Sequence, residues 1–127
     1  MRRHRDWLRQ ARRKLESAKW DIEGEFFEDA CFSSQQAAEL AAKALFESKG
    51  EIKFGHSIFH LLRGWAETPV DILSAAQVLD RYYIPTRYPN SFDRGSPMDY
   101  FDRKTAQEAV GFAEIILKFV EGRVAGV

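Results

Sequence analysis

The chain has 127 residues, of which 45% are hydrophobic and 30% are charged, and its 19 Lys and Arg balance its 19 Asp and Glu. This composition excludes a disordered tail, and the length predicts a single domain, residues 1–127, around one core. The apolar runs are a few residues long, against the roughly 20 that cross a membrane, and no secretion signal follows Met1, so we expect a cytoplasmic protein with no membrane partner.

The first predicted helix runs to about Gly24, because apolar residues recur along it at steps of three and four. These residues are Leu8, Ala11, Leu15, Ala18 and Ile22. The opposite side carries Arg5, Arg9, Arg12 and Arg13. Residues 1–14 have seven basic residues and one acidic residue, a charge of +6, and residues 15–30 have a charge of −5. The zero net charge of the chain therefore excludes bulk coating of nucleic acid, but a local basic surface remains possible. The arginine stripe is either solvated charge or a surface for RNA or an acidic protein.

A second helix is predicted from about Phe26 to Ser48, with Gly50 beyond its end. Six alanines between residues 30 and 44 make it narrow, so neighbouring helices can approach closely and we place it at the centre of a bundle. Cys31 is expected to be a small apolar residue of this helix. As the lone cysteine it has no partner for an internal disulfide, which suits a reducing compartment.

Three further helices follow in the pattern. A short one is centred on Ile58 to Trp65, a fourth carries apolar residues from Ile72 to Tyr83, and the last carries them from Ala106 to Val120. No segment alternates cleanly with period two, so no sheet is predicted.

Residues 84–101 break the helical pattern, because they hold three of the four prolines of the chain. At about eighteen residues this segment exceeds the ~12–15 beyond which structureless connections are uncommon and are usually functional or disordered. It carries Tyr88, Phe92, Tyr100 and Phe101, and so many aromatic residues argue against simple disorder.

Four blocks of sequence occur in a characteristic order. They are ACFSSQQAAE at residues 30–39, KAL at 43–45, GHSI at 55–58 with the leucines at 61–62, and YIPTRYPN at 83–90. Together they resemble the HEPN domain family, over the chain from Trp7 to about Val120. The resemblance implies an all-α, up-and-down antiparallel bundle of four main helices plus a short helix, often dimeric. It also implies a partner, a nucleotidyltransferase encoded nearby, in a toxin–antitoxin-like or nucleotide-handling pair.

Relatives with ribonuclease activity carry an arginine followed four to six residues later by a histidine, paired across the dimer. No arginine here has a histidine at that distance, since the histidines stand at positions 4, 56 and 60, upstream of the loop. Histidine is the side chain best able to exchange a proton near neutral pH. We therefore expect a binding protein rather than an enzyme.

The alternative is a metal-independent endoribonuclease with a non-standard site, in which Arg87 acts with Tyr100, six positions after Arg94. A tyrosine with an ordinary pKa near ~10 is a poor proton acceptor at pH 7, which disfavours this alternative. By resemblance to some relatives, Tyr100 is otherwise a candidate target for nucleotide transfer by the partner enzyme.

Arg87 is the first candidate for a phosphate contact. A guanidinium can hold a phosphate through two parallel hydrogen bonds, and the flanking prolines at 85 and 89 limit the conformations of the segment. Tyr88 beside it can stack on a base or pack beneath the loop. The alternative is that Arg87 pairs with Asp80 or Asp93 and only pins the loop.

Further candidates lie upstream. Gln36, Glu39 and Lys43 share one side of the second helix, where Glu39 and Lys43 form either an ordinary surface pair or, with Lys43 near Arg87, a second phosphate contact. His56 belongs to a family-like block and is a candidate for the same site, whereas Ser57 or Gly55 is expected near the cap of the short helix.

Metal and cofactor sites are not expected. His56 and His60 are four residues apart and could share a helix face, but no third ligand is evident, and the chain has no phosphate-cradling glycine motif.

The predicted function is therefore binding of a nucleotide or RNA phosphate, through Arg87, Tyr88, Lys43, Gln36 and His56, in a protein that partners a nucleotidyltransferase. A homodimer is expected, because Trp7, Trp20 and Tyr83 add exposed aromatic surface to the alanine-rich helix faces.

Overall fold

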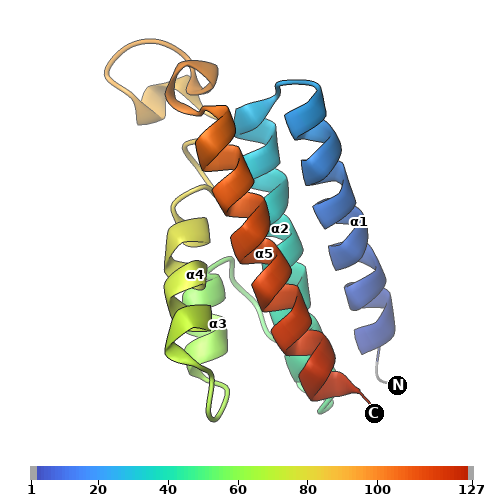
Figure 1. Ribbon diagram of the computed structural model, residues 1–127. Coiled ribbons are helices and arrows are strands. Elements are labelled where there is room, and N and C mark those ends of the chain that lie inside the picture. The colour runs from blue at the N-terminus through green and yellow to red at the C-terminus, as the bar shows by residue number, and fades with distance from the viewer. Residues whose placement is uncertain (1–2, 126–127) are drawn as a thin grey trace.

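The computed structural model describes residues 3–125, and within that range every regular element is helical. The long helices are α1 (His4–Glu23), α2 (Phe27–Glu47), α4 (Val70–Asp80) and α5 (Arg103–Val124), and α3 (Ile58–Arg63) is short. They form an up-and-down bundle (Figure 1). The predicted fold class, four main helices and a short one without a sheet, is confirmed for this part of the chain.

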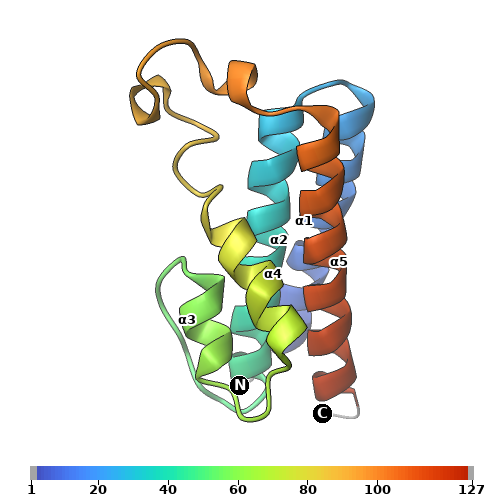
Figure 2. The same ribbon diagram turned by 60° about the vertical axis from the view of Figure 1, so that its left-hand side comes forward.

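Helix α2 occupies the centre of the bundle, packed against α1 on one side and α5 on the other (Figures 1 and 2). Its alanines are almost completely buried, at 0–1% exposure. Because alanine has no side chain beyond Cβ, the flanking helices approach closely, and larger residues such as Leu45 and Ile116 fill the core. The apolar stripe predicted for the first helix is buried as expected.

The helix ends follow local chemistry. Gly24 is the C-cap of α1, and Ser57 is the N-cap of α3, where its hydroxyl accepts a hydrogen bond from the backbone N–H of His60 at 3.1 Å. Both predicted caps are confirmed.

The fourth helix is shorter than predicted, since it ends at Asp80 and leaves Tyr82 and Tyr83 in the turns beyond it. The N–H of Tyr82 already bonds the carbonyl of Leu79, three residues back, which tightens the last turn. Pro85 then disfavours a helical conformation for the residue before it. This early end turns the Tyr83 side chain toward α2, where the candidate site forms.

The segment between α4 and α5 extends beyond one end of the bundle (Figure 2). It contains two short 3₁₀ turns, Pro89–Ser91 and Pro97–Tyr100. Phe92 and Tyr100 stack at 3.9 Å between ring centroids, and Phe101 packs edge-on against Phe92 and Tyr82. The predicted loop is therefore held together by its own aromatic side chains.

Among the described residues, no helix is long and apolar enough to cross a membrane.

Candidate phosphate-binding site

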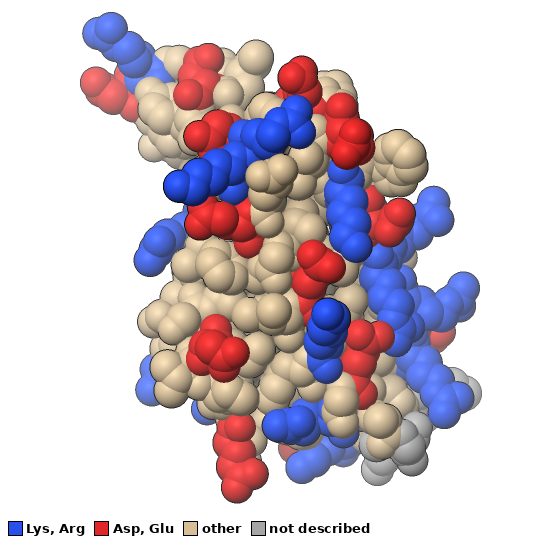
Figure 3. Space-filling view, viewed as in Figure 1, with Lys and Arg blue, Asp and Glu red and all other residues tan. Residues whose placement is uncertain are grey.

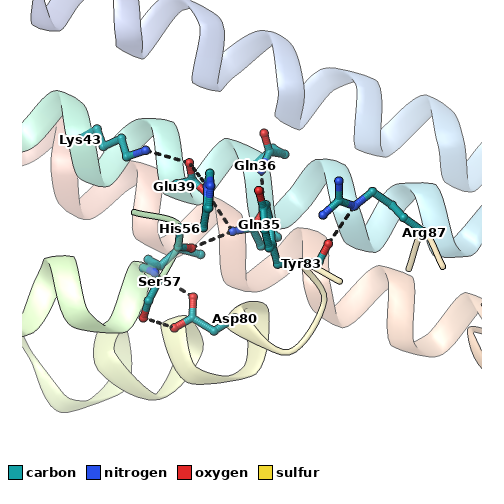
Figure 4. Close-up of polar contacts among 10 residues, drawn as sticks. Gln35, Gln36, Glu39, Lys43, His56, Ser57, Asp80, Tyr83 and Arg87 are labelled. Atoms are coloured by element: carbon teal, nitrogen blue, oxygen red, sulfur yellow. Dashed lines mark hydrogen bonds and ion pairs between the residues drawn. The ribbon is translucent and has the colours of Figure 1, made fainter. Parts of the chain in front are cut away.

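Three segments meet beside α2 and bring together most of the candidates named from the sequence. They are the side of α2 that carries Glu39 and Lys43, the residues just before α3, and the turn that follows α4 (Figure 4). Together they form a continuous series of contacts that runs from Lys43 and Glu39 of α2, through His56 before α3, to Tyr83 and Arg87 after α4.

Arg87 lies at one end of this series and is held without a carboxylate. Its Nε donates to the backbone carbonyl of Tyr83 at 2.9 Å. Its guanidinium carbon lies 4.6 Å from the ring centres of Phe32 and Tyr83 and 5.0 Å from that of Tyr88. Three aromatic faces and one hydrogen bond thus orient an exposed cation.

The alternative pairing of Arg87 with Asp80 or Asp93 is not found. Within residues 3–125, Arg87 forms no ion pair, and Asp80 instead accepts bonds from the Ser57 hydroxyl and from the backbone N–H groups of Ile58 and Phe59. The two terminal guanidinium nitrogens of Arg87 have no hydrogen bond in the described chain, so they can form the two parallel bonds that a phosphate accepts.

Glu39 is the buried centre of the polar contacts. Its side chain is 7% exposed and accepts from Lys43 Nζ at 3.0 Å, from Gln35 Nε2 at 3.1 Å and from His56 Nδ1 at 3.2 Å. The Lys43 side chain is only 12% exposed, so the interpretation of Glu39 and Lys43 as an ordinary surface pair is wrong. Lys43 neutralises Glu39 and is not placed against Arg87, because Glu39 lies between the ammonium and the rest of the series.

His56 connects the buried carboxylate of Glu39 to the aromatic rings of Phe32, Tyr83 and Tyr88 around Arg87, here called the Arg87 platform. Nδ1 contacts Glu39, and the imidazole stacks on Tyr83 with ring centres 4.3 Å apart and planes 18° apart. Its backbone carbonyl accepts from Gln35 at 3.1 Å, and more than half of the side chain is exposed. His56 and Arg87 both contact the Tyr83 ring, so the imidazole centre and the guanidinium carbon are at most about 9 Å apart, the sum of those two distances.

Gln36 joins the site through Gln35, to whose Oε1 its Nε2 donates at 2.8 Å. It is half-buried and stands one helical turn after Phe32, the residue beneath Arg87. Phe32 and Tyr83 are central to this geometry and were not predicted as site residues. The i, i+4 spacing of Phe32 and Gln36 is the one sequence signal that could have pointed to Phe32.

Tyr88 and Tyr100 are placed differently. Tyr88 forms part of the Arg87 platform and is 46% exposed. The hydroxyl of Tyr100 donates to the carbonyl of Arg94, and its ring stacks on Phe92, so both of these contacts lie within the loop.

His56 and His60 do not share a helix face, although their separation of four residues is compatible with one. His56 precedes the N-cap of α3, whereas His60 lies inside that helix against Phe59. In the described part of the chain, no group of three His, Cys, Asp or Glu side chains is placed to hold a metal ion.

Cys31 lies inside α2 and takes no part in the site. Burial, reinforced by the carboxyls of Asp102 and Glu28, raises the pKa of its thiol to about 12. A thiol held in this way is unreactive at neutral pH.

Comparison with known proteins gives matches along nearly the whole chain. A family model described as "HEPN domain" matches residues 4–123. A protein of Methanocaldococcus jannaschii named "Putative toxin MJ1304" is 23% identical over 127 residues, covering 91% of this chain and 84% of its own length.

Solved structures are more similar. TT1696 from Thermus thermophilus is 44% identical with a TM-score of 0.94, covering 97% of this chain and 99% of that one. ST0689, described as an archaeal HEPN homologue, is 44% identical with a TM-score of 0.85 over 98% and 99% of the two chains. An HEPN domain protein from Thermotoga maritima, tm0613, is 34% identical with a TM-score of 0.78 over 96% and 99%.

Proposed function

This chain belongs to the HEPN domain family, and from that premise we propose that it binds the phosphate of a nucleotide or an RNA at Arg87 and acts as the partner of a nucleotidyltransferase. The relative named as a toxin supports a toxin-like role for such a pair. The buried lone thiol of Cys31 supports action in the reducing cytoplasm.

The observation that carries the proposal is the state of Arg87. Surface arginines commonly pair with a carboxylate, yet this one is oriented by Tyr83, Phe32 and Tyr88 and has two unbonded terminal nitrogens in the described chain. An orientation fixed before binding lowers the entropy lost when the phosphate arrives. The site is therefore suited to a phosphate monoester or diester.

The neighbouring residues have distinct roles in this proposal. Exposed Tyr88 offers a ring face to a base, and Gln36 and His56 offer hydrogen-bonding groups beside it. Lys43 acts indirectly: by neutralising Glu39 it removes a negative charge that would repel the phosphate.

Calorimetric titration with ATP and with a short single-stranded RNA tests the proposal. We expect saturable binding, weakened about tenfold or more in Arg87→Ala, since hydrogen bonds to a charged group contribute about 1.5–3 kcal/mol. Arg87→Lys should bind with intermediate affinity, because lysine keeps the charge but loses the fork. Arg81→Ala removes an exposed arginine that makes none of these ring contacts and serves as the matched control. Absence of saturation with both ligands would contradict the proposal.

One observation favours a second candidate function, metal-independent cleavage of RNA. The sequence places no histidine in the loop, but the fold brings His56 close to Arg87. Glu39 holds the His56 imidazole through Nδ1, and Nε2 of His56 has no hydrogen bond among the described residues. An imidazole held in this way can take the proton of a ribose 2′-hydroxyl while Arg87 stabilises the charge on the phosphorane. The 2′-oxygen then bonds to phosphorus and the P–O5′ bond breaks. The leaving 5′-oxygen takes up a proton from water, and the imidazolium of His56 returns its proton to the resulting hydroxide. His56 is better suited to this role than Tyr100, whose hydroxyl is engaged within the loop.

Incubation of labelled RNA with the protein in EDTA distinguishes the two candidates. Cleavage that leaves a 2′,3′-cyclic phosphate, is lost in His56→Gln and spares a 2′-deoxy substrate would establish the ribonuclease. Intact RNA together with normal calorimetric binding would exclude the second candidate and leave the first in place.

A further inference from the structure

We propose that the outward face of α1 binds a single strand of nucleic acid, at a surface separate from the Arg87 site. The two flanks of α1 are occupied within the bundle: Asp21 accepts from Ser33 of α2, while Arg12 and Lys19 pair with Glu121 and Glu114 of α5 at 2.7 and 3.7 Å. The face between these flanks is solvent-exposed, and Arg9, Arg13 and Trp20 lie along it at helical steps.

The charge of this face is largely unneutralised. Arg9 and Arg13 have neither an ion pair nor a hydrogen bond in the part of the chain that the structure describes, and Glu16 is the acid that lies between Arg13 and Trp20. Figure 3 shows Lys and Arg side chains gathered along the side of the molecule that α1 forms. Their long side chains and Trp20 wall an open groove of about 660 Å³.

Trp20 indicates the kind of polyanion. It is 69% exposed, whereas Trp7 and Trp65 pack against the core. A groove of cations with an exposed aromatic face is the arrangement on which successive bases of a single strand stack. An acidic peptide would use the two guanidinium groups but would gain little from an indole face, so the nucleic acid is the better match.

The dimensions of the surface set the length of strand that it covers. At 1.5 Å per residue, Arg9 and Trp20 are about 16 Å apart along α1. That distance accommodates about five nucleotides at 3.4 Å each. Two arginines on this length imply two phosphate contacts. We therefore expect the binding to be weak and sensitive to salt.

Titration with a twelve-residue oligouridylate, followed by tryptophan fluorescence for stacking and by calorimetry for affinity, tests the proposal. Stacking should quench the signal, and the quenching should disappear in Trp20→Phe while most of the affinity remains. Arg9→Gln combined with Arg13→Gln should lower the slope of log affinity against log salt by about 1.4, and affinity at 0.1 M salt by about 25-fold, at 0.7 per phosphate for single strands. Arg63→Gln, an exposed arginine on α3, is the matched control.

Further measurements distinguish the α1 surface from the Arg87 site. Trp20 quenching that persists in Arg87→Ala, with ATP binding unchanged in the α1 variants, would support two separate surfaces. Equal binding of polyglutamate or of a duplex of the same length, with no effect of Trp20→Ala, would overturn the proposal, as would an unchanged salt slope in the double variant. Thermal unfolding of each variant confirms that the bundle is intact.

Discussion

Two charged residues of the candidate site are treated in opposite ways by this fold. Glu39 is buried and fully satisfied by Lys43, Gln35 and His56, whereas Arg87 keeps two donor nitrogens without a partner in the described chain. The first arrangement stabilises the protein only while Glu39 and Lys43 are both present, because a lone buried charge is costly. The second leaves hydrogen-bonding capacity for a ligand.

Glu39→Gln should therefore destabilise the protein although its shape is preserved. The change leaves the mostly buried ammonium of Lys43 without its counter-ion, and we expect a loss of about 2–3 kcal/mol in the free energy of unfolding, measured in urea. Glu47→Gln, on the same helix, is the control and should change it by less than about 0.5 kcal/mol. Equal effects of the two substitutions would show that the buried pair contributes nothing special.

Cys31 predicts a distinct dependence on pH. Its pKa is raised to about 12 from 9.0, so above pH 9 the unfolded chain releases a proton that the folded chain retains. The contribution to stability is complete below pH 9 and is lost as pH rises toward 12, at roughly 1.4 kcal/mol per unit. Between pH 8 and 10.5 the wild type should lose about 2 kcal/mol more than Cys31→Ala. Parallel stability curves for the two proteins would refute this.

At the scale of elements, the short helix α3 depends on α4. Asp80, at the end of α4, accepts from the Ser57 hydroxyl at 2.8 Å and from the first N–H groups of α3, at 2.7 Å for Ile58 and 3.1 Å for Phe59. Six residues are too few for an independently stable helix. The same contact fixes the residue before the N-cap, which is His56.

Asp80→Ala should loosen α3 and the His56 end of the site together. We expect faster amide hydrogen exchange over residues 58–63 and a loss of about 1–3 kcal/mol in stability, because the N–H groups lose their acceptor. Asp71→Ala, in the exposed first turn of α4, should leave the exchange of α3 unchanged. Protection that is equal in both variants would mean that the carboxylate is not what holds α3.

The elements could be predicted from the sequence more fully than the site. The buried stripe of α1 and the alanines of α2 determine their helices locally, and the prolines mark the loop. The end of α4 could not be predicted, because it depends on a tightened last turn before Pro85. Arg87, His56, Gln36 and Lys43 could be named as candidates, but their connection through Phe32, Glu39 and Tyr83 is tertiary and leaves no local periodicity.

Across the whole molecule, a net charge of zero results from local regions whose charges are arranged differently. The basic side chains of α1 face solvent, whereas at the Arg87 site Lys43 neutralises the buried carboxylate of Glu39. Large apolar side chains also remain exposed far from the core. Those more than 60% exposed are Trp20, Ile52, Phe54, Val70 and Met98.

Such exposed apolar surface predicts self-association, in line with the homodimer expected from the sequence. Light scattering at micromolar concentration should give about twice the chain mass of 14.7 kDa. Phe54→Ser, at an 85% exposed position, and Val70→Ser, at a 79% exposed position, should show which part of this surface is buried on association, through a rise in the dissociation constant. A monomeric mass at micromolar concentration would exclude the homodimer and any site shared between two copies.

The most direct test of the Arg87 site is a nuclear magnetic resonance titration of the ¹⁵N-labelled protein with ATP. The Nε resonance of Arg87, assigned by its absence in Arg87→Lys, should shift in proportion to saturation, together with the amides of Gln36, His56 and Tyr83. Arg81 should not respond. Largest shifts elsewhere, or no shift of the Arg87 resonance at saturating ATP, would contradict the account.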